Sequence, residues 1–175
     1  MEATVLDEAE LRTFLAERYP RLVAGVALIA GSSAAAEDAV QEALARAWER
    51  SDRGEHFDSL AAWVTRVAVN LSKSRLRRLR AEGRARDRIV HAARAAPLDL
   101  EVRLDIEHAL AALPRRQREV TVLRYYLGLD VDETAATLEV SAGTVKTCLF
   151  RARRALATAL GETDPEETND HAELR

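Results

Sequence analysis

The segment from residue 133 to residue 154 constrains the fold of this chain more than any other part of it. It reads ETAATLEVSAGTVKTCLFRARR, and its pattern predicts two short helices joined by a tight turn at residues 139–140. Ser141 is a suitable N-cap for the second helix, because its hydroxyl can accept a hydrogen bond from a free backbone N–H of the first turn. Val145 and Leu149 lie four residues apart and therefore face the same side of that helix. The segment thus predicts a helix-turn-helix, with an ordinary helical hairpin as the alternative.

The opposite face of the second predicted helix is mostly polar and basic. Its positions hold Lys146, Thr147, Phe150 and Arg151. A helix of this kind fits the major groove of DNA, which is about 12 Å wide, and can bring Lys, Thr and Arg side chains to base edges and phosphates. Phe150 has a second interpretation, since its ring can also pack on a neighbouring helix.

The composition predicts an all-helical protein and argues against several classes of function. The chain has 175 residues, of which 47% are hydrophobic but only 5% aromatic, with 7 Gly and 4 Pro. No apolar run reaches the roughly 18 residues of a membrane span, and the acidic first residues lack the layout of a signal peptide. The single cysteine, Cys148, permits no disulfide within the chain and suits a reducing cytoplasm. Metal-ligand spacing, a phosphate-binding loop and a nucleophile motif are all missing, so we expect no metal, no cofactor and no enzyme.

Charge is distributed unevenly along the chain, although the net charge is only −3. Residues 1–62 carry 12 acids and 6 bases, residues 66–88 carry 9 bases and 2 acids, and residues 162–175 carry 6 acids and 1 base. A basic middle between acidic segments indicates two kinds of partner: nucleic acid for the basic part and a basic protein surface for the acidic parts.

Helical periodicity divides the chain into two predicted units. The first covers residues 1–80, a linker covers 81–103, the second unit covers 104–160, and an acidic tail covers 161–175. Within these units the pattern predicts helices over residues 8–30, 34–50, 60–80 and 115–127. The first should bend at Pro20 and stop at Gly31, and the second should have Ser33 as its N-cap and Trp48 on its apolar side. Ser59 is the predicted N-cap of the third.

The predicted helix over residues 60–80 has one continuous polar face. The positions on it are spaced by four, three and four residues, and they are Arg66, Asn70, Lys73 and Arg77. Trp63 falls on the apolar side together with Val67, so we expect it in the core rather than at a binding surface. The helix therefore combines a buried stripe with a basic track.

Three collinear stretches resemble bacterial sigma factors of the extracytoplasmic-function (ECF) group, which keep only sigma regions 2 and 4. They are AEDAVQEALARAW at residues 36–48, LAAWVTRVAVNLSKSRLRR at 60–78, and LPRRQREVTVLRYYLGLDVDETAATLEVSAGTVKTCLFRARRAL at 113–156. A lone helix-turn-helix is weak evidence, whereas three stretches in the order and spacing of one family are specific. The chain is most similar to short actinobacterial members. The resemblance implies two small all-α domains joined by a linker.

The resemblance also implies a role for residues of each stretch. The family's D-x-x-Q-E pattern, which docks on the clamp helices of the largest subunit of RNA polymerase, corresponds to Asp38, Gln41 and Glu42. Residues 51–78 resemble the element that captures a flipped base of the promoter −10 element and helps hold the duplex open, and the implied contacts are His56, Phe57, Arg66, Asn70, Lys73, Arg77 and Arg78. The helix-turn-helix resembles the −35 reader, with contacts from Lys146, Thr147, Phe150 and Arg151 and phosphate contacts from Arg153 and Arg154.

The function implied by the resemblance is promoter recognition on behalf of RNA polymerase. We expect a cytoplasmic protein that binds core RNA polymerase and promoter DNA, with an anti-sigma factor as a further partner in many relatives. The main alternative is a stand-alone helix-turn-helix regulator that binds duplex operators as a dimer. The acidic strip and the basic helix favour the sigma factor, because a dimer interface requires neither. A sigma-like protein used only for binding is a second alternative, and an enzyme is the least supported.

Overall fold

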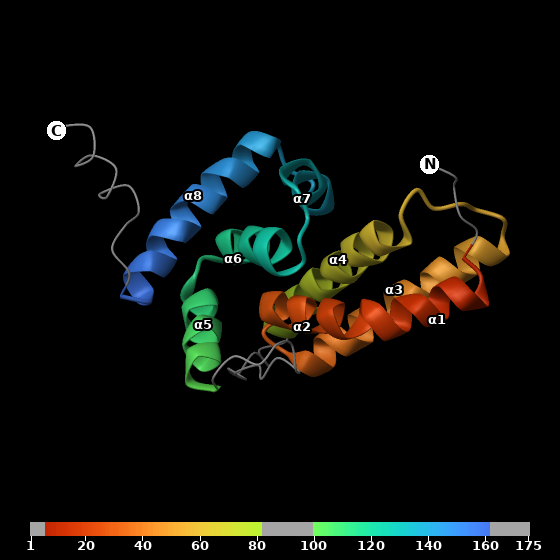
Figure 1. Ribbon diagram of the computed structural model, residues 1–175, viewed down its shortest axis with the longest axis horizontal. Coiled ribbons are helices and arrows are strands. Elements are labelled where there is room, and N and C mark those ends of the chain that lie inside the picture. Colours follow the sequence, from red (N-terminus) through yellow and green to blue (C-terminus); the bar gives the residue numbers. More distant parts are fainter. Residues whose placement is uncertain (1–5, 82–99, 162–175) are drawn as a thin grey trace.

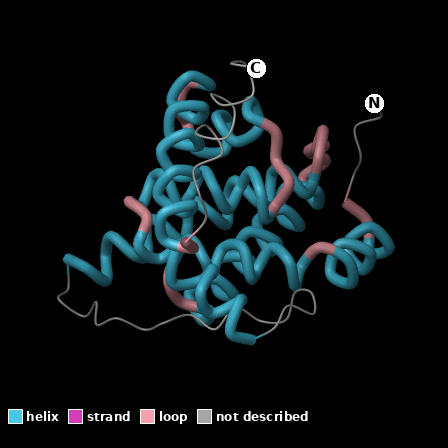
Figure 2. Tube along the Cα trace, turned by 60° about the vertical axis from the view of Figure 1, so that its left-hand side comes forward, coloured by secondary structure: helices cyan, strands magenta, loops and turns pink. Residues whose placement is uncertain are grey.

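Helices make up the regular structure of the protein. The computed structural model describes residues 6–81 and 100–161, and within these ranges it contains no strand (Figure 1). The first unit comprises α1 (Glu8–Glu17), α2 (Tyr19–Ala30), α3 (Ser33–Asp52) and α4 (Leu60–Ala81). The second comprises α5 (Leu100–Ala112), α6 (Arg115–Thr121), a π-helical turn η1 (Val122–Tyr126), α7 (Val131–Leu138) and α8 (Ala142–Ala159). Short loops connect the successive helices within each unit, and the predicted all-helical fold is confirmed (Figure 2).

Local sequence signals set the ends of helices in the first unit. The chain bends between α1 and α2 at Pro20, which lies in the first turn of α2 and has no N–H with which to continue α1. Gly31 ends α2 with a φ of 73°, a conformation that is unstrained only for a residue without Cβ. Ser59 caps α4 by accepting a hydrogen bond from the backbone N–H of Ala62 at 3.2 Å. The bend, the stop and this cap are confirmed.

The predicted helix-turn-helix is formed by α7 and α8. At the start of α7 the Asp130 carboxylate accepts from the N–H of Glu133, and the Glu133 carboxylate accepts from the N–H of Asp130, both at 2.8 Å. Glu139 makes the turn with a φ of 56°, and the Ser141 hydroxyl accepts from the N–H of Thr144 at 3.1 Å. The predicted turn and the predicted cap of α8 are therefore confirmed.

Three predictions are wrong in detail. Ser32 rather than Ser33 caps α3, because its hydroxyl is placed to accept from the N–H of Ala35 at 3.3 Å. Trp48, predicted on the apolar side of α3, is 43% exposed because the buried stripe passes through Ala47, one residue or about 100° away around the helix. The helix predicted over 115–127 changes at Val122 into a π-helical turn.

The predicted linker and acidic tail lie mostly outside the described residues, and the second unit begins earlier than predicted. Helix α5 begins at Leu100, four residues before the position where periodicity placed the start of the second unit. Most of the linker, residues 82–99, and most of the acidic tail, residues 162–175, lie outside the described residues.

The two units pack against each other through α2 and α4 on one side and η1 and α7 on the other (Figure 1). The Arg21 guanidinium donates two hydrogen bonds to the carbonyl oxygen of Tyr126, the one from Nε at 2.8 Å, and lies 5.8 Å from the centroid of the Tyr126 ring. The carbonyl groups at the end of a helix lack intrahelical donors, so Arg21 supplies the missing one. Leu127 packs so closely on Gly25 that a Cβ added there would lie 2.8 Å from Leu127 Cδ2. One hydrophobic cluster consequently runs through both units.

Candidate polymerase and DNA interfaces

The outer face of α3 carries an exposed acidic strip. Asp38, Gln41 and Glu42 are all exposed, and their spacing of three and one residues places them on one side of the helix, away from its buried stripe. Arg46 Nε donates to Glu42 Oε1 at 2.8 Å, but both side chains are about half exposed. Such a surface ion pair is worth only about 0–1 kcal/mol, so it can be exchanged for a partner's basic residue at little cost. The structure thus brings together the three residues predicted to bind polymerase.

The loop at residues 53–59, between α3 and α4, contains the two residues predicted to frame a flipped base. His56 is exposed. Phe57 is only 6% exposed and packs its ring against Trp63, with the ring centroids 5.3 Å apart and the planes at 65°. Burial of this aromatic side chain stabilises the loop and leaves little of the ring to contact a base. The contact of Phe57 with a flipped base stays a prediction. Trp63 is half-buried against the core, as predicted.

The predicted polar face of α4 is only partly open to solvent. Arg66 is exposed, whereas Asn70 and Lys73 are half-buried, and Lys73 Nζ donates to Asn70 Oδ1 at 3.3 Å. Burial lowers the pKa of the Lys73 ammonium, and the nearby Glu119 carboxylate opposes that shift. Two predicted phosphate contacts on the last turns of α4 have side chains outside the described residues, and they are Arg77 and Arg78.

The second unit covers this face of α4. A groove of about 290 Å³ separates α4 and its preceding loop from α7. His56 and Arg66 line the groove on the side of the first unit, and Glu133 and Thr137 line it on the side of the second. His56 and Arg66 therefore lie opposite the first helix of the helix-turn-helix, and the Glu133 carboxylate on the other wall of the groove repels a DNA phosphate.

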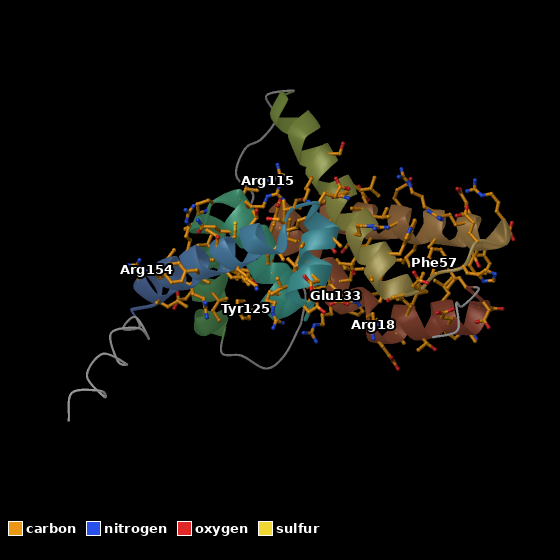
Figure 3. All side chains as sticks on the ribbon, turned by 90° about the horizontal axis from the view of Figure 1, so that it is seen from above. Arg18, Phe57, Arg115, Tyr125, Glu133 and Arg154 are labelled. Carbon is orange, nitrogen blue, oxygen red and sulfur yellow. The ribbon has the colours of Figure 1, made fainter. Side chains whose placement is uncertain are left out.

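Sequence reasoning missed the residues that join the two units. Arg18 and Glu133, labelled in Figure 3, come from different units and line a second groove of about 440 Å³. Arg21 and the buried Glu119 also lie at or near this junction. Each of these residues has an ordinary position in a helical pattern, and no local signal indicates which distant helix it will meet.

The exposed face of α8 presents the predicted −35 residues together. All of them are exposed, while the opposite side of α8 buries Val145, Leu149 and Ala152; the exposed residues are Lys146, Thr147, Phe150, Arg151, Arg153 and Arg154. Phe150 is 39% exposed, and the Arg154 guanidinium lies 5.9 Å from its ring centroid. Phe150 is thus part of the outer surface. Cys148 is half-buried at the edge of this face.

The described residues contain neither a cluster suited to a metal ion nor a helix suited to a membrane span. In residues 6–81 and 100–161, no three His, Cys, Asp or Glu side chains gather closely enough to hold a metal ion. None of the helices in those ranges is both long and apolar enough to cross a lipid bilayer.

Comparison with known proteins assigns the family. Residues 15–82 match the model of Sigma-70 region 2, and residues 103–156 match that of Sigma-70, region 4. SigL, an ECF RNA polymerase sigma factor of Mycobacterium tuberculosis, is 33% identical over 162 residues, which cover 89% of this chain and 92% of SigL. The chain belongs to the ECF RNA polymerase sigma factors.

This ECF sigma factor resembles further members of the family. SigM of Mycobacterium tuberculosis is 32% identical over 134 residues, which cover 77% of this chain and 68% of SigM. Among solved structures, the sigma factor RpoE from Bartonella quintana, in complex with the anti-sigma factor NepR, is 30% identical, with a TM-score of 0.72 over 87% of this chain and 97% of RpoE. The protein is thus a transcription factor that directs promoter-specific initiation, and the comparisons do not favour a stand-alone regulator.

Proposed function

We propose that this ECF sigma factor docks on the clamp helices of RNA polymerase through Asp38, Gln41 and Glu42 and reads a promoter with α4 and α8. The observation that carries the assignment is the exposed acidic strip on α3, which lies within the match to sigma region 2. Carboxylates at an interface complement a basic partner surface and set the orientation of docking. Their exposure leaves them available to such a partner.

The −10 element is assigned to the loop before α4 and to the polar face of α4. Arg66 and Lys73 neutralise backbone phosphates of the melted strand, and the Asn70 amide hydrogen-bonds to a base edge. Arg77 and Arg78, whose side chains lie outside the described residues, are proposed as further phosphate contacts from their place in the sequence. His56 is exposed in the loop and frames the base, next to the largely buried Phe57, which lines the same groove.

The −35 element is assigned to α8 as the recognition helix in the major groove. Lys146, Thr147 and Arg151 face base edges and phosphates, and the Phe150 ring makes an apolar contact. Arg153 and Arg154 bind flanking phosphates. The exposure of all six side chains on one face supports this assignment.

A further partner is an anti-sigma factor in the cytoplasm, where the sigma factor meets the polymerase. Support comes from RpoE of Bartonella quintana, which is similar to this chain over most of its length and was solved with the anti-sigma factor NepR. The acidic strip and the DNA-binding helices are the surfaces that such an inhibitor would have to block.

The decisive experiment measures binding to purified core RNA polymerase. Replacing both Asp38→Arg and Glu42→Arg should lower the affinity at least a hundredfold, because leaving an interfacial charge unpaired costs about 2–5 kcal/mol. Affinity is measured by fluorescence titration of labelled sigma factor with core enzyme, and circular dichroism checks the fold.

A matched control is available on the same helix. Glu37→Arg with Glu49→Arg makes the same change in net charge at exposed positions outside the strip, and it should leave core binding within about threefold of the wild type. Equal affinity of the strip variant and the wild-type protein would overturn the docking assignment. Tight duplex-DNA binding by the protein alone, with no promoter-dependent transcript from core enzyme, would instead support a stand-alone regulator.

A further inference from the structure

Arg50, near the end of α3, contacts the loop at residues 53–59 from three directions. Its backbone carbonyl oxygen accepts hydrogen bonds from the N–H groups of Arg53 and Glu55, each at 3.1 Å. Its Nη2 forms an ion pair with Glu55 Oε2 inside the loop. Its guanidinium lies 5.4 Å from the ring centroid of Trp63, on the first turn of α4. The side chain thus joins the loop to the helix that follows it.

These contacts link two loop residues, Glu55 and Phe57, through Arg50 and Trp63. Trp63, held by Arg50 on one side, packs on the buried Phe57 on the other, and Phe57 is itself a loop residue. The loop is therefore anchored at two points, Glu55 and Phe57, with exposed His56 between them. Gly54, just before the two anchors, adopts a φ of 79°, a conformation that a residue without Cβ reaches at no steric cost.

We propose that Arg50 is a positioning residue for promoter recognition, which holds the loop in the conformation that presents His56 and Arg66 to the melted strand. The inference rests on the proposed reading of the −10 element. Arg50 lines the groove that contains both His56 and Arg66, so a shift of the loop would change the shape of that groove. Losing the anchor increases the number of loop conformations, and the DNA must then provide the free energy of ordering.

An alternative role for Arg50 is to bind a DNA phosphate directly. Removing the Glu55 carboxylate distinguishes this role from positioning of the loop. If Arg50 only attracted phosphate, removing the Glu55 carboxylate would strengthen DNA binding, because a repulsive charge is lost. If Arg50 positions the loop through Glu55, the same change weakens base selection. Reversing the pair, with Arg50→Glu and Glu55→Arg, restores the ion pair but cannot restore an arginine–phosphate contact at position 50.

The experiment uses holoenzyme assembled from core RNA polymerase and a single-stranded DNA library with a randomised centre as the probe. Wild-type holoenzyme should enrich a preferred sequence. Arg50→Ala should bind that sequence roughly three- to thirtyfold more weakly and should flatten the enrichment, since an exposed ion pair and a cation–π contact are lost together. Arg50→Lys keeps the charge but not the planar stack, so we expect an intermediate loss.

Three readouts distinguish positioning from a purely structural or electrostatic effect. The salt dependence of DNA affinity should stay unchanged in Arg50→Ala, whereas a lost phosphate contact would reduce the slope by about 0.7. Amide hydrogens of residues 53–59 should exchange faster in Arg50→Ala and regain protection in the charge-reversed pair. Core binding should be unaffected, and Arg12→Ala, which breaks an exposed ion pair with Glu8 on α1, is the matched control.

Each alternative result overturns a defined part of the inference. Unchanged enrichment in Arg50→Ala, or a reduced salt slope without rescue by the reversed pair, would contradict the positioning role. Loss of core binding in Arg50→Ala and Arg50→Lys alike would show a structural role instead. Failure of the wild-type holoenzyme to select any sequence would contradict −10 reading itself, and with it the role of Arg50.

Discussion

At the scale of single residues, burial decides which charged groups are free to bind DNA. Arg115 and Arg116 belong to the basic run RRQR at residues 115–118. In the structure Arg115 Nε donates to Glu119 Oε1 at 2.7 Å and Arg116 Nη1 donates to Glu119 Oε2 at 3.0 Å. The Glu119 side chain is only 1% exposed, whereas the two arginines keep 35% and 45% of their side-chain area exposed. A buried carboxylate with two donors is thus the centre of the second unit's charge network.

Removing the Glu119 carboxylate should destabilise the fold. Glu119→Ala leaves two guanidinium groups without their acceptor, and breaking a buried ion pair costs about 3–5 kcal/mol. Because both arginines can reach water, we expect a loss at or just below the lower end of that range, about 2–3 kcal/mol, in the free energy of unfolding measured by urea denaturation. Glu8→Ala removes an acid that is 81% exposed from its pair with Arg12, so it should change the free energy by less than about 0.5 kcal/mol. Equal stability of the two variants would contradict a structural role for Glu119.

The sequence predicted the exposure of site residues well where helical spacing determines which face of a helix a side chain lies on. The strip Asp38, Gln41 and Glu42 and the outer face of α8 are exposed as their spacing predicted. The burial of Phe57 was not predicted, because the direction of a side chain in a loop depends on contacts with another element, in this case Trp63. Lys73 has the spacing of a surface residue but is half-buried, because a distant unit packs beside it.

At the scale of elements, the helix ends were largely predictable and the departures from regular helix were not. Caps and stops depend on residues next to them in sequence, as at Pro20 and Ser141. The π-helical turn η1 follows from a shift in pairing, with the Leu127 N–H donating to the Val122 carbonyl oxygen at 2.9 Å. Nothing in the local pattern marks that shift. Its effect is to place Leu127 and the Tyr126 carbonyl against α2.

The backbone of Glu139, in the turn between α7 and α8, is strained, and the strain can be tested by substitution. Glu139 adopts a φ of 56°, a left-handed conformation that costs an ordinary L-residue about 1–2 kcal/mol. Glu139→Gly relieves the steric part of this cost, which stabilises the folded state. The greater flexibility of glycine in the unfolded chain offsets part of that gain, so the free energy of unfolding should rise by only about 0.5–1 kcal/mol. Glu139→Val should lower it, since a β-branched residue tolerates positive φ poorly. Urea denaturation checks both variants, and a Val variant as stable as the Gly variant would show that the turn is not strained.

At the scale of the whole molecule, the arrangement of the two units matters as much as their separate folds. The exposed faces of α3 and α8 remain open in this arrangement, whereas three residues proposed to read the −10 element, His56, Arg66 and Lys73, lie beside the second unit. Two small domains joined by a linker could be predicted from sequence, but their contact could not, because it depends on side chains about a hundred residues apart, such as Arg21 and Tyr126. If α4 reads the melted strand as proposed, that strand and α7 compete for the same face of α4.

That competition can be tested at Gly25 in α2, against which Leu127 of the second unit packs. Gly25→Ala improves the helix propensity of α2 by about 1 kcal/mol, yet its Cβ would lie 2.8 Å from Leu127 Cδ2, so the change opposes closure without weakening the helix. Gly25→Leu should do so more strongly. If the packed arrangement of the two units is favoured over their separation by about 1.4 kcal/mol, the units are separated in only about a tenth of the protein. Complete separation should then raise the affinity of the free protein for single-stranded DNA about tenfold. The radius of gyration from small-angle scattering should increase in parallel.

A compensating change makes the test specific to the contact between the units. Leu127→Ala in the Gly25→Ala background removes the atoms that a Cβ would meet, so it should restore the compact form and the weak binding to single-stranded DNA. Affinity for duplex DNA should not change in any of these variants, because the exposed face of α8 is not covered by the first unit. An unchanged radius of gyration with an unchanged affinity in Gly25→Leu would mean that Leu127 moves aside while the units stay together. A larger radius without tighter binding would mean instead that α7 does not compete with the melted strand.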